Sequence, residues 1–186
     1  MDRTSHRDAA WHDALHERFW PDVYRMLARL VADGQDAMDL AQSTFLTAWS
    51  KREEVPDDPK AWLFATARFH HKNHVRQATR HGLTLVDTTQ LEAALVTDGP
   101  ESAVCTGVDL AAPWARLNRK EQQLLQWAYL DDLSIAEIAQ VLGIRPGTAR
   151  TRVARAKNKL RDAYERVNGA PAARAAATRR RSDRHG

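Results

Sequence analysis

Apolar residues recur along almost the whole chain at the spacing of α-helices. Residues three and four positions apart share one face of a helix. This spacing covers residues 9–31, 37–52, 60–80, 114–130, 135–142 and 147–166. Nowhere does the sequence keep the apolar–polar alternation that is typical of a strand. The pattern therefore predicts an all-α fold, in which each helix buries one apolar stripe.

Helix-breaking and helix-capping residues lie at the borders of the front stretches. Asp33-Gly34 is expected to end the first long helix, and Asp36 is expected to cap the next one. Asp58-Pro59 supplies a cap and a first-turn proline for the helix that follows. These residues support separate helices in the front half of the chain.

The clearest local signal is a helix, a tight turn and a second helix between residues 134 and 160. Ser134 and Glu137 are three apart before an apolar run, which is the arrangement of a capping box. Gly143 suits a left-handed residue at the end of the first helix, and Pro146 suits the first turn of the next. Together these residues predict a helix-turn-helix.

The second helix of this motif is predicted to have a strongly cationic outer face. Its apolar residues share one side, namely Ala149, Val153, Ala156 and Leu160. The opposite side and its flanks carry Thr151, Arg155, Asn158, Arg150, Arg152, Lys157 and Lys159. Residues 145–161 hold seven Lys or Arg and no acid, whereas an ordinary solvated helix mixes both signs. Such a helix suits the negatively charged groove of DNA.

The charge distribution divides the chain into two blocks. The formal net charge is +4, but residues 82–113 hold five acids and no Lys or Arg. That stretch lacks firm periodicity, and a connection of this length is unusual inside one compact domain. We therefore expect two small helical domains, residues 9–81 and 114–167, joined by a flexible acidic linker. The tail, 168–186, is rich in Ala and Arg and is expected to be disordered.

Composition and spacing argue against an enzyme. Cys105 is the one cysteine, so neither a disulfide framework nor a cysteine-based zinc site can form within the chain. His70 and His74 have the i,i+4 spacing of metal ligands, but no nearby Cys, Asp or Glu completes a site. No phosphate-binding loop or nucleophile motif is present. We therefore expect no cofactor, no bound metal and no catalytic residue.

Nothing in the sequence points to a membrane. It has no apolar run of about 18 residues, and its polar N-terminus is unlike a signal peptide. We expect a soluble cytoplasmic protein with no membrane partner.

Two stretches of the front half are rich in aromatic residues. Residues 36–49 read DAMDLAQSTFLTAW and end in Phe45 and Trp49, four apart on one helical face. Residues 57–80 place Trp62, Phe64 and Phe69 ahead of a basic end that holds no acid. Aromatic residues beside bases can hold unstacked bases of a nucleic acid strand. The same pattern also fits a core helix with a solvated end, and periodicity alone leaves both interpretations open.

Both halves, in order, resemble the sigma factors of bacterial RNA polymerase. Region 2.2 of that family often reads DLVQETFLRAW, and residues 39–49 read DLAQSTFLTAW. Regions 2.3 and 2.4 often read AWLFRIARNLALDHLR, and residues 61–76 read AWLFATARFHHKNHVR. Residues 117–161 are similar to region 4. With regions 2 and 4 alone, the chain resembles the small extracytoplasmic-function (ECF) group.

The resemblance implies an alternative sigma factor, which binds core RNA polymerase and directs it to promoters. Region 2, within residues 9–81, would dock on the polymerase and would recognise and melt the −10 element. Region 4, within residues 114–167, would bind the −35 element. The implied partners are the β and β′ subunits of the polymerase, promoter DNA and, as often in this group, an anti-sigma factor. Such a protein associates with the nucleoid.

The same resemblance implies roles for particular residues. The helix that would dock on the β′ subunit carries Asp39, Gln42, Phe45 and Trp49. The residues that would face −10 DNA are Trp62, Arg68, Lys72, Asn73 and Arg76. Those that would contact the −35 element are Arg145, Thr148, Arg150, Thr151, Arg152 and Arg155.

Four sites depart from the family pattern. Ser43 stands where Glu is usual, Phe69 stands where Asn is common, and Asn118 stands where Pro is common. His70-His71 replaces an aliphatic pair. None of them removes a catalytic group, because this family acts by binding.

A second function is also compatible with the sequence. A helix-turn-helix transcription regulator could bind DNA through its second half and sense a signal with its helical front half, without binding core polymerase. Initiation of transcription by purified core enzyme separates the two functions.

Overall fold

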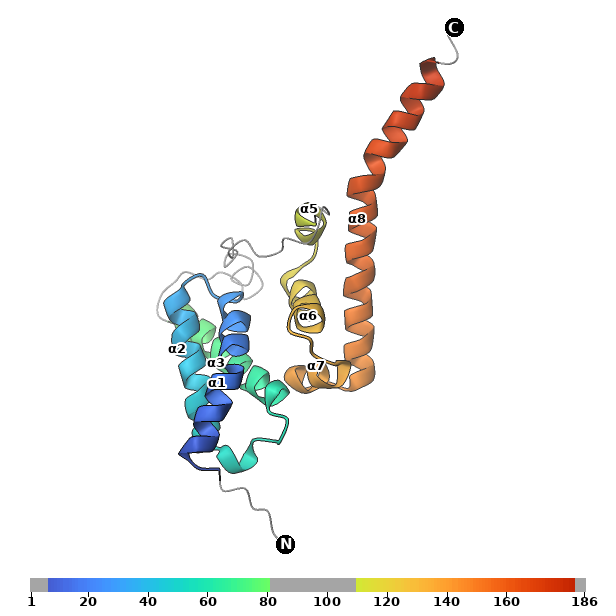
Figure 1. Ribbon diagram of the computed structural model, residues 1–186. Coiled ribbons are helices and arrows are strands. Elements are labelled where there is room, and N and C mark those ends of the chain that lie inside the picture. Colours follow the sequence, from blue (N-terminus) through green and yellow to red (C-terminus); the bar gives the residue numbers. More distant parts are fainter. Residues whose placement is uncertain (1–6, 81–109, 183–186) are drawn as a thin grey trace.

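A computed structural model describes residues 7–80 and 110–182, with side chains described as far as residue 167. The elements are, in chain order, α1 (Ala9–Ala28), α2 (Gly34–Ser50), the 3₁₀ turn η1 (Arg52–Glu54), α3 (Lys60–Arg80), α5 (Ala111–Trp114), α6 (Arg119–Tyr129), α7 (Ile135–Leu142) and α8 (Pro146–Ser182). The residues described include no strand, and the predicted all-α fold is confirmed. Figure 1 shows α1–α3 on one side of the molecule and α5–α8 on the other.

Helices α1, α2 and α3 form the front half by packing their apolar stripes together. Asp8 and Asp33 cap the first two helices, and the Asp33 carboxylate accepts a hydrogen bond from the Gln35 backbone N–H at 2.9 Å. The start of α2 therefore differs from the sequence prediction, which placed the cap at Asp36. Asp33 lies just outside the helix, where its side chain can reach a free N–H, whereas Asp36 is already within the first turn.

The second half contains the predicted helix-turn-helix. Ser134 and Glu137 form a capping box at the start of α7, with N···O distances of 2.7 and 3.2 Å. Gly143 then ends α7 with a φ of 66°, in the left-handed region that glycine adopts without steric cost. Helix α8 turns its apolar side inward, and Ala149, Val153 and Ala156 are buried.

Asn118 has a structural reason for standing where the related sequences often have Pro. Its side chain accepts a hydrogen bond from the Glu121 backbone N–H at 2.9 Å, and the Glu121 carboxylate accepts one from the Asn118 N–H at 2.9 Å. This second capping box fixes the start of α6.

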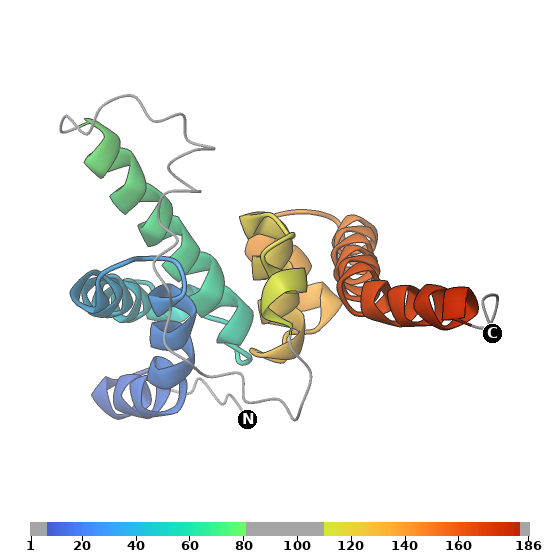
Figure 2. The same ribbon diagram turned by 90° about the horizontal axis from the view of Figure 1, so that it is seen from above.

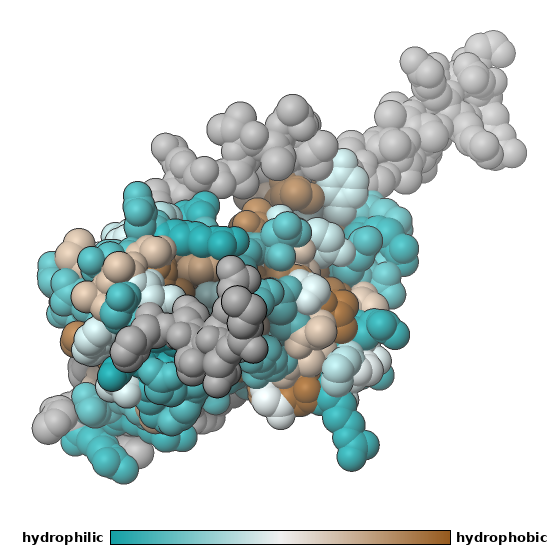
Figure 3. All heavy atoms as spheres, turned by 60° about the horizontal axis from the view of Figure 1, so that its bottom comes forward, coloured by the Kyte–Doolittle hydropathy of each residue, from teal (hydrophilic) through white to brown (hydrophobic). Residues whose placement is uncertain are grey.

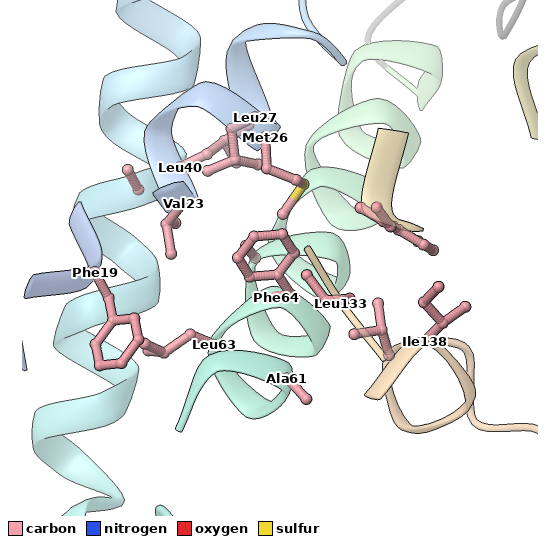
Figure 4. Packing of buried hydrophobic residues seen from close by; sticks show 14 of the residues in the cluster. Phe19, Val23, Met26, Leu27, Leu40, Ala61, Leu63, Phe64, Leu133 and Ile138 are labelled. Atoms are coloured by element: carbon pink, nitrogen blue, oxygen red, sulfur yellow. The ribbon is translucent and has the colours of Figure 1, made fainter. Parts of the chain in front are cut away.

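The two halves pack against each other through α3 and α7. Phe64 of α3 lies beside Leu133, which precedes α7, and Ile138 lies on the same seam (Figure 4). Met26 of α1 and Trp127 of α6 belong to the same apolar cluster. Seen from above in Figure 2, α6 and α7 lie alongside α3. The halves that the sequence predicts as separate modules therefore share one hydrophobic core.

Two sequence predictions concern the linker, residues 82–113, and the tail, residues 168–186. Most of the predicted linker, 82–113, lies outside the described residues, but its end forms the short helix α5, in which Pro113 is buried. The tail, 168–186, is expected from its composition to be disordered, whereas α8 continues as a helix to Ser182. Ala and Arg are among the strongest helix formers, so local propensity favours this continuation.

The face of the molecule shown in Figure 3 is largely hydrophilic. Within the described residues, the large apolar side chains exposed to solvent are Met38, Leu46, Trp49, Phe69, Leu110, Tyr129 and Leu130. No helix in this part of the chain combines the length and the apolar character needed to cross a bilayer. Exposed apolar side chains that cluster on a polar surface mark candidate contacts with a partner.

Candidate nucleic-acid interface

The outer face of α8 is the first candidate for DNA contact. All the residues predicted to reach the −35 element are exposed, namely Arg145, Thr148, Arg150, Thr151, Arg152 and Arg155. At 100° per residue, Thr148, Thr151 and Arg155 fall within about 60° of one another, with Arg150 and Arg152 on the flanks. The structure therefore brings these side chains to one accessible surface at the start of α8.

This face of α8 keeps its positive charge. Among the residues whose side chains are described, no carboxylate lies within 4.0 Å of Arg150, Arg152 or Arg155. The neighbouring Lys159 differs, because its Nζ donates a hydrogen bond to the Glu121 carboxylate of α6 at 2.7 Å. The arginines are thus placed to contact phosphates and base edges, while the lysine ties α8 to α6.

Helix α3 carries a second cationic surface, at the edge that borders the second half. Lys72 and Arg76 are exposed and Arg68 is half-buried. All three line a cavity of about 280 Å³, together with Arg119 and Lys120 of α6. The structure thus brings together three of the residues predicted to face −10 DNA, and it places them next to the helix-turn-helix half.

The other two residues predicted for the −10 site lie apart from this edge. Trp62 is half-buried and packs against the apolar core, as the core-helix interpretation of the sequence requires. Asn73 lies across the crest of α3 and lines a separate cavity of about 350 Å³ with Asp36 and Asp39 of α2. Because carboxylates repel phosphates, this second cavity does not suit a DNA backbone.

Phe69 is a candidate site residue that the resemblance did not place among the −10 contacts. Its side chain is 59% exposed, on the crest of α3 between the two cavities. By helix geometry it lies within about 40° of Asn73 and about 20° of Arg76. The ring of His70 meets it edge-on, with 5.8 Å between ring centres. The signal in the sequence was an aromatic residue at a position where the family commonly has Asn.

The outer face of α2 exposes most of the residues predicted to dock on a partner. Asp39 and Gln42 are exposed, and Trp49 is 37% exposed. The structure contradicts the predicted docking role of Phe45, because its side chain is only 2% exposed and cannot contact a partner. Its ring packs against that of Trp20 of α1, with 5.7 Å between ring centres. Phe45 therefore holds α1 and α2 together.

Leu46, next to Phe45 in the sequence, is the exposed apolar side chain of this part of α2. Its side chain is 67% exposed, more than any other large apolar side chain in the described part of the chain. It lies four residues after Gln42 and three before Trp49, so the three share one face of α2. The guanidinium of Arg52 lies 5.0 Å from the Trp49 ring centre and steadies the ring at the end of this face.

Two histidines of α3, His70 and His74, contact α2. Thr47 Oγ1 lies 2.9 Å from His70 Nε2, and His74 Nε2 lies 3.5 Å from the Asp36 carboxylate. Burial lowers the pKa of His70, so its imidazole is neutral near pH 7. Across the described ranges, no three His, Cys, Asp or Glu side chains gather as ligands for a metal ion. His70 and His74 thus tie α3 to α2.

Models of two sigma-factor domains match the two halves of the chain. Sigma-70 region 2 matches residues 15–81, and Sigma-70 region 4 matches residues 115–160. The ECF RNA polymerase sigma factor SigL of Mycobacterium tuberculosis is 30% identical over 159 residues, which cover 83% of this chain and 89% of SigL. The chain belongs to the ECF sigma factors. SigW of Bacillus subtilis, another ECF sigma factor, is 26% identical over 157 residues, which cover 75% of this chain and 81% of SigW.

Two solved structures share the fold of this ECF sigma factor. RpoE, in a co-crystal structure with the anti-sigma factor NepR from Bartonella quintana, has a TM-score of 0.60 at 21% identity. That match covers 82% of this chain and 96% of RpoE. CnrH, solved with the cytosolic domain of CnrY, has a TM-score of 0.55 at 20% identity, and the match covers 83% of this chain and 88% of CnrH.

As an ECF sigma factor, the chain is an alternative transcription initiation factor that directs RNA polymerase to promoters. Region 2 contains α1, α2 and α3, and region 4 contains α6, α7 and the first part of α8. The exposed basic face of α8 therefore belongs to the DNA-binding helix-turn-helix of region 4.

Proposed function

We propose that region 2 of this ECF sigma factor docks on the β′ subunit of core RNA polymerase through the outer face of α2, and that the β subunit also contacts the chain. Leu46 and Trp49 are exposed on this face, beside Asp39 and Gln42. A partner that covers this apolar surface gains affinity by removing it from water. Tryptophan is enriched among the residues that dominate protein interfaces, so Trp49 is the expected anchor.

The −10 element is the proposed ligand of α3. Lys72 and Arg76, at the exposed edge, would contact the phosphates of the DNA strand, and Arg68 would support them from the cavity. Phe69 would stack on a base that has left the duplex. Unstacking costs a few kcal/mol per base, and stacking on an aromatic side chain returns about 1–3 kcal/mol. The phenyl ring thus favours stacking where an Asn would favour a hydrogen bond to a base edge.

The −35 element is the proposed ligand of α8. The start of this helix would enter the major groove, as the second helix of a helix-turn-helix does. Arg155 and Thr151 lie at the centre of the exposed face and would contact base edges, while Arg150 and Arg152 would contact phosphates on either side. Phosphate contacts set the position on the DNA, and base contacts set the sequence preference.

The observation that carries this proposal is the presence of two different exposed faces in one chain. Helix α2 presents an apolar face, and α8 presents a basic face with no carboxylate among residues 145–161. A helix-turn-helix regulator that does not bind core polymerase needs the face on α8 and has no use for the face on α2. The apolar face of α2 and the basic face of α8 together fit a factor that joins DNA to a large protein partner.

Run-off transcription with purified core polymerase tests the proposal. The linear template would carry a promoter found by mapping transcript starts after overexpression of the chain. We expect transcripts from one start site when the chain is added, and none with core enzyme alone. DNA binding by the chain without initiation on any such template would favour the regulator instead.

An anti-sigma factor is a further proposed partner. The solved relatives RpoE and CnrH are complexes with NepR and with the cytosolic domain of CnrY. An inhibitor that covers the apolar face of α2 would compete directly with the polymerase. Without an inhibitor, affinity for polymerase and DNA would keep the chain at the nucleoid.

Replacing Phe69 with Ala is expected to lower the yield of open promoter complexes about tenfold, because the melted −10 base loses its stacking partner. Phe69→Trp should retain most of the activity, since any aromatic ring supplies a stacking surface. The measurement is the fluorescence of 2-aminopurine placed at the −10 position, which is quenched when the base stacks on a protein ring.

Leu130→Ala is the matched control for Phe69→Ala, because it removes a similarly exposed apolar side chain from the loop before α7. It should leave the 2-aminopurine signal unchanged. If Phe69→Trp loses as much as Phe69→Ala, the ring does not stack on a base and its assignment to the −10 element is wrong.

A further inference from the structure

A cavity of about 280 Å³ lies where helix α6 of region 4 comes beside helix α3 of region 2 (Figure 2). One wall is α3, from Arg68 to Arg76, and the other wall is α6, from Arg119 to Gln126. Arg29 and Leu30, after the end of α1, complete the described lining. Both regions of the chain therefore contribute side chains to one concave surface.

Half of the described residues that line this cavity are Arg or Lys. Some of these cations are half-buried in the walls, and the others are exposed to solvent. The half-buried ones are Arg29, Arg68 and Arg119, and the exposed ones are Lys72, Arg76 and Lys120. A ligand in the cavity would therefore meet cations both within the walls and at the solvent-exposed edge.

The described lining includes no carboxylate. Residues 60–80, which form α3, contain no Asp or Glu. Glu121 is the one acid of α6, and its carboxylate accepts hydrogen bonds from the Asn118 backbone N–H at 2.9 Å and from Lys159 Nζ of α8 at 2.7 Å. Glu121 thus serves the helix cap and α8, and the formal charge of the two walls is strongly positive.

Arg29 differs from the other lining cations, because an ion pair holds it across the seam between the regions. Its Nη2 donates a hydrogen bond to the Asp131 carboxylate at 2.5 Å, and the side chain of Asp131 is 5% exposed. This carboxylate offsets the charge of Arg29. The attraction for a ligand therefore comes chiefly from the cations of α3 and α6.

These cations are concentrated in a way that an ordinary helix surface avoids. Arg68, Lys72 and Arg76 follow one another at i,i+4 spacing on α3, and like charges at that spacing destabilise a helix. Arg119 and Lys120 bring two more positive charges to the facing wall. Charges act more strongly in a partly enclosed space than in bulk water, because the effective dielectric constant is lower. An anion with several charges is therefore favoured here over the open surface.

The size and the donors of the cavity select the kind of anion. A guanidinium presents paired N–H donors that match two oxygens of a phosphate. The volume lies just below the range of about 300–1,000 Å³ that is typical of small-molecule sites, so the cavity suits a compact group. The side-chain amides of Gln123 and Gln126 add neutral hydrogen-bond donors on the α6 wall. A short chain of phosphate groups combines several charges with a small volume and so meets these requirements.

We infer that this cavity between α3 and α6 is a binding site for a compact polyphosphate, which is either an inorganic polyphosphate or the phosphate end of a nucleotide. Arg68 of α3 and Arg119 of α6 bind the phosphate oxygens from the two walls. Lys72, Arg76 and Lys120 add charge at the exposed edge. The site is thus a small-molecule site on a chain whose other ligands are proteins and DNA.

A bound polyphosphate would compete with the −10 strand, since Lys72 and Arg76 are also the proposed phosphate contacts of that strand. The concentration of the polyphosphate would then adjust promoter opening by this sigma factor. This consequence rests on the proposed function, whereas the site itself does not.

Titration of the full chain with inorganic triphosphate tests the site. The measurement is isothermal titration calorimetry at about 150 mM ionic strength, where attraction to scattered surface charges is screened, and without Mg²⁺, which would chelate the ligand. We expect saturable binding that is at least about tenfold tighter than that of sulfate at the same ionic strength, because triphosphate can reach cations of both walls. Triphosphate should also raise the melting temperature of the chain, since it binds the folded form.

Arg119→Gln should weaken triphosphate binding about tenfold, because it removes a charge-assisted hydrogen bond to the phosphates. Arg116→Gln is the matched control, since it removes the same charge three positions earlier, from an exposed arginine that is not among the lining residues. The control should bind triphosphate as the wild type does. Lys120→Gln, at an exposed position, should weaken binding too and decides the matter if Arg119→Gln does not fold.

Equal affinity for triphosphate in Arg119→Gln, Lys120→Gln and Arg116→Gln would overturn the site, because binding would then reflect net charge alone. Binding of triphosphate no tighter than that of sulfate would overturn it as well. A nucleoside triphosphate distinguishes the two sources of the phosphate chain. An affinity equal to that of inorganic triphosphate shows recognition of the phosphates alone, and a higher affinity shows that the nucleoside is also contacted.

A labelled single strand of the mapped −10 sequence separates the failure of this site from the failure of the proposed function. Triphosphate should lower the affinity of the chain for this strand. If triphosphate binds and Arg119→Gln weakens it, but the strand is unaffected, the −10 role of Lys72 and Arg76 is wrong and the polyphosphate site stands. If the strand binds and triphosphate does not, the polyphosphate site is wrong and the −10 role stands.

Discussion

Core RNA polymerase is expected to bind the Trp49→Ala variant about 30-fold more weakly than the wild-type chain, the loss typical of a central interface residue. Trp49 is exposed at the end of the α2 face, and no other aromatic side chain on that face is accessible. Its loss removes the one accessible aromatic ring of this face of α2. The measurement is the dissociation constant of the chain from core enzyme, with a fluorescent label on the chain.

Phe69→Ala is the control for this prediction, because it also removes an exposed aromatic ring, but from the crest of α3. Its affinity for core enzyme should equal that of the wild type, although its promoter melting is impaired. Leu46→Ala should also weaken core binding, since it removes an apolar side chain that is 67% exposed on the same face. Unchanged co-purification of Trp49→Ala with the polymerase would show that α2 is not the docking helix.

The helix-turn-helix could be predicted from the sequence because its determinants are local. The capping box of Ser134 and Glu137 and the left-handed Gly143 each act within a few residues, and each is found in the structure. The buried and exposed sides of α8 follow in the same way from its periodicity, because one side carries small apolar residues and the other carries bases. Here local propensity and tertiary packing favour the same structure.

The docking face of α2 could be predicted only in part. Phe45 and Leu46 are adjacent apolar residues, and either could have pointed inward as far as the sequence shows. The choice depends on α1, where Trp20 and His16 form the aromatic surroundings that receive the ring of Phe45. A residue-level prediction of the face therefore needed the packing of a helix that lies some 25–30 positions away, which a periodicity argument does not contain.

The contact between the two halves could not be predicted from local patterns. Arg29 and Asp131 are separated by 102 positions, and each is unremarkable in its own segment. A long acidic stretch between two helical blocks favoured independent modules, and composition gives no measure of how well Phe64 and Leu133 fit together. The same long-range packing places Arg68 and Lys72 beside α6, so the surroundings of the −10 residues were also beyond reach.

Replacing Arg155 with Ala is expected to weaken binding of the holoenzyme to a promoter about tenfold or more, since an arginine that contacts a guanine contributes about 1–3 kcal/mol of discrimination. Arg155 lies at the centre of the exposed face of α8, and in the described structure no carboxylate lies within 4.0 Å of it. The loss should shrink when the −35 sequence is scrambled, because the wild type then makes no specific contact to lose. Affinity for core enzyme should stay unchanged.

Arg161→Ala is the matched control for Arg155→Ala, because it removes the same side chain less than two turns further along α8. Its guanidinium lies 4.0 Å from the carboxylates of both Asp162 and Glu165, so its charge is already offset within the helix. We expect it to bind the promoter as the wild type does. Arg155→Lys separates the two kinds of DNA contact: it keeps the charge, so the salt dependence of binding should stay close to that of the wild type, while the preference for the −35 sequence should fall. Equal losses for Arg155→Ala and Arg161→Ala would mean that α8 contributes only a general positive charge, and sequence recognition would then have to come from another part of the chain.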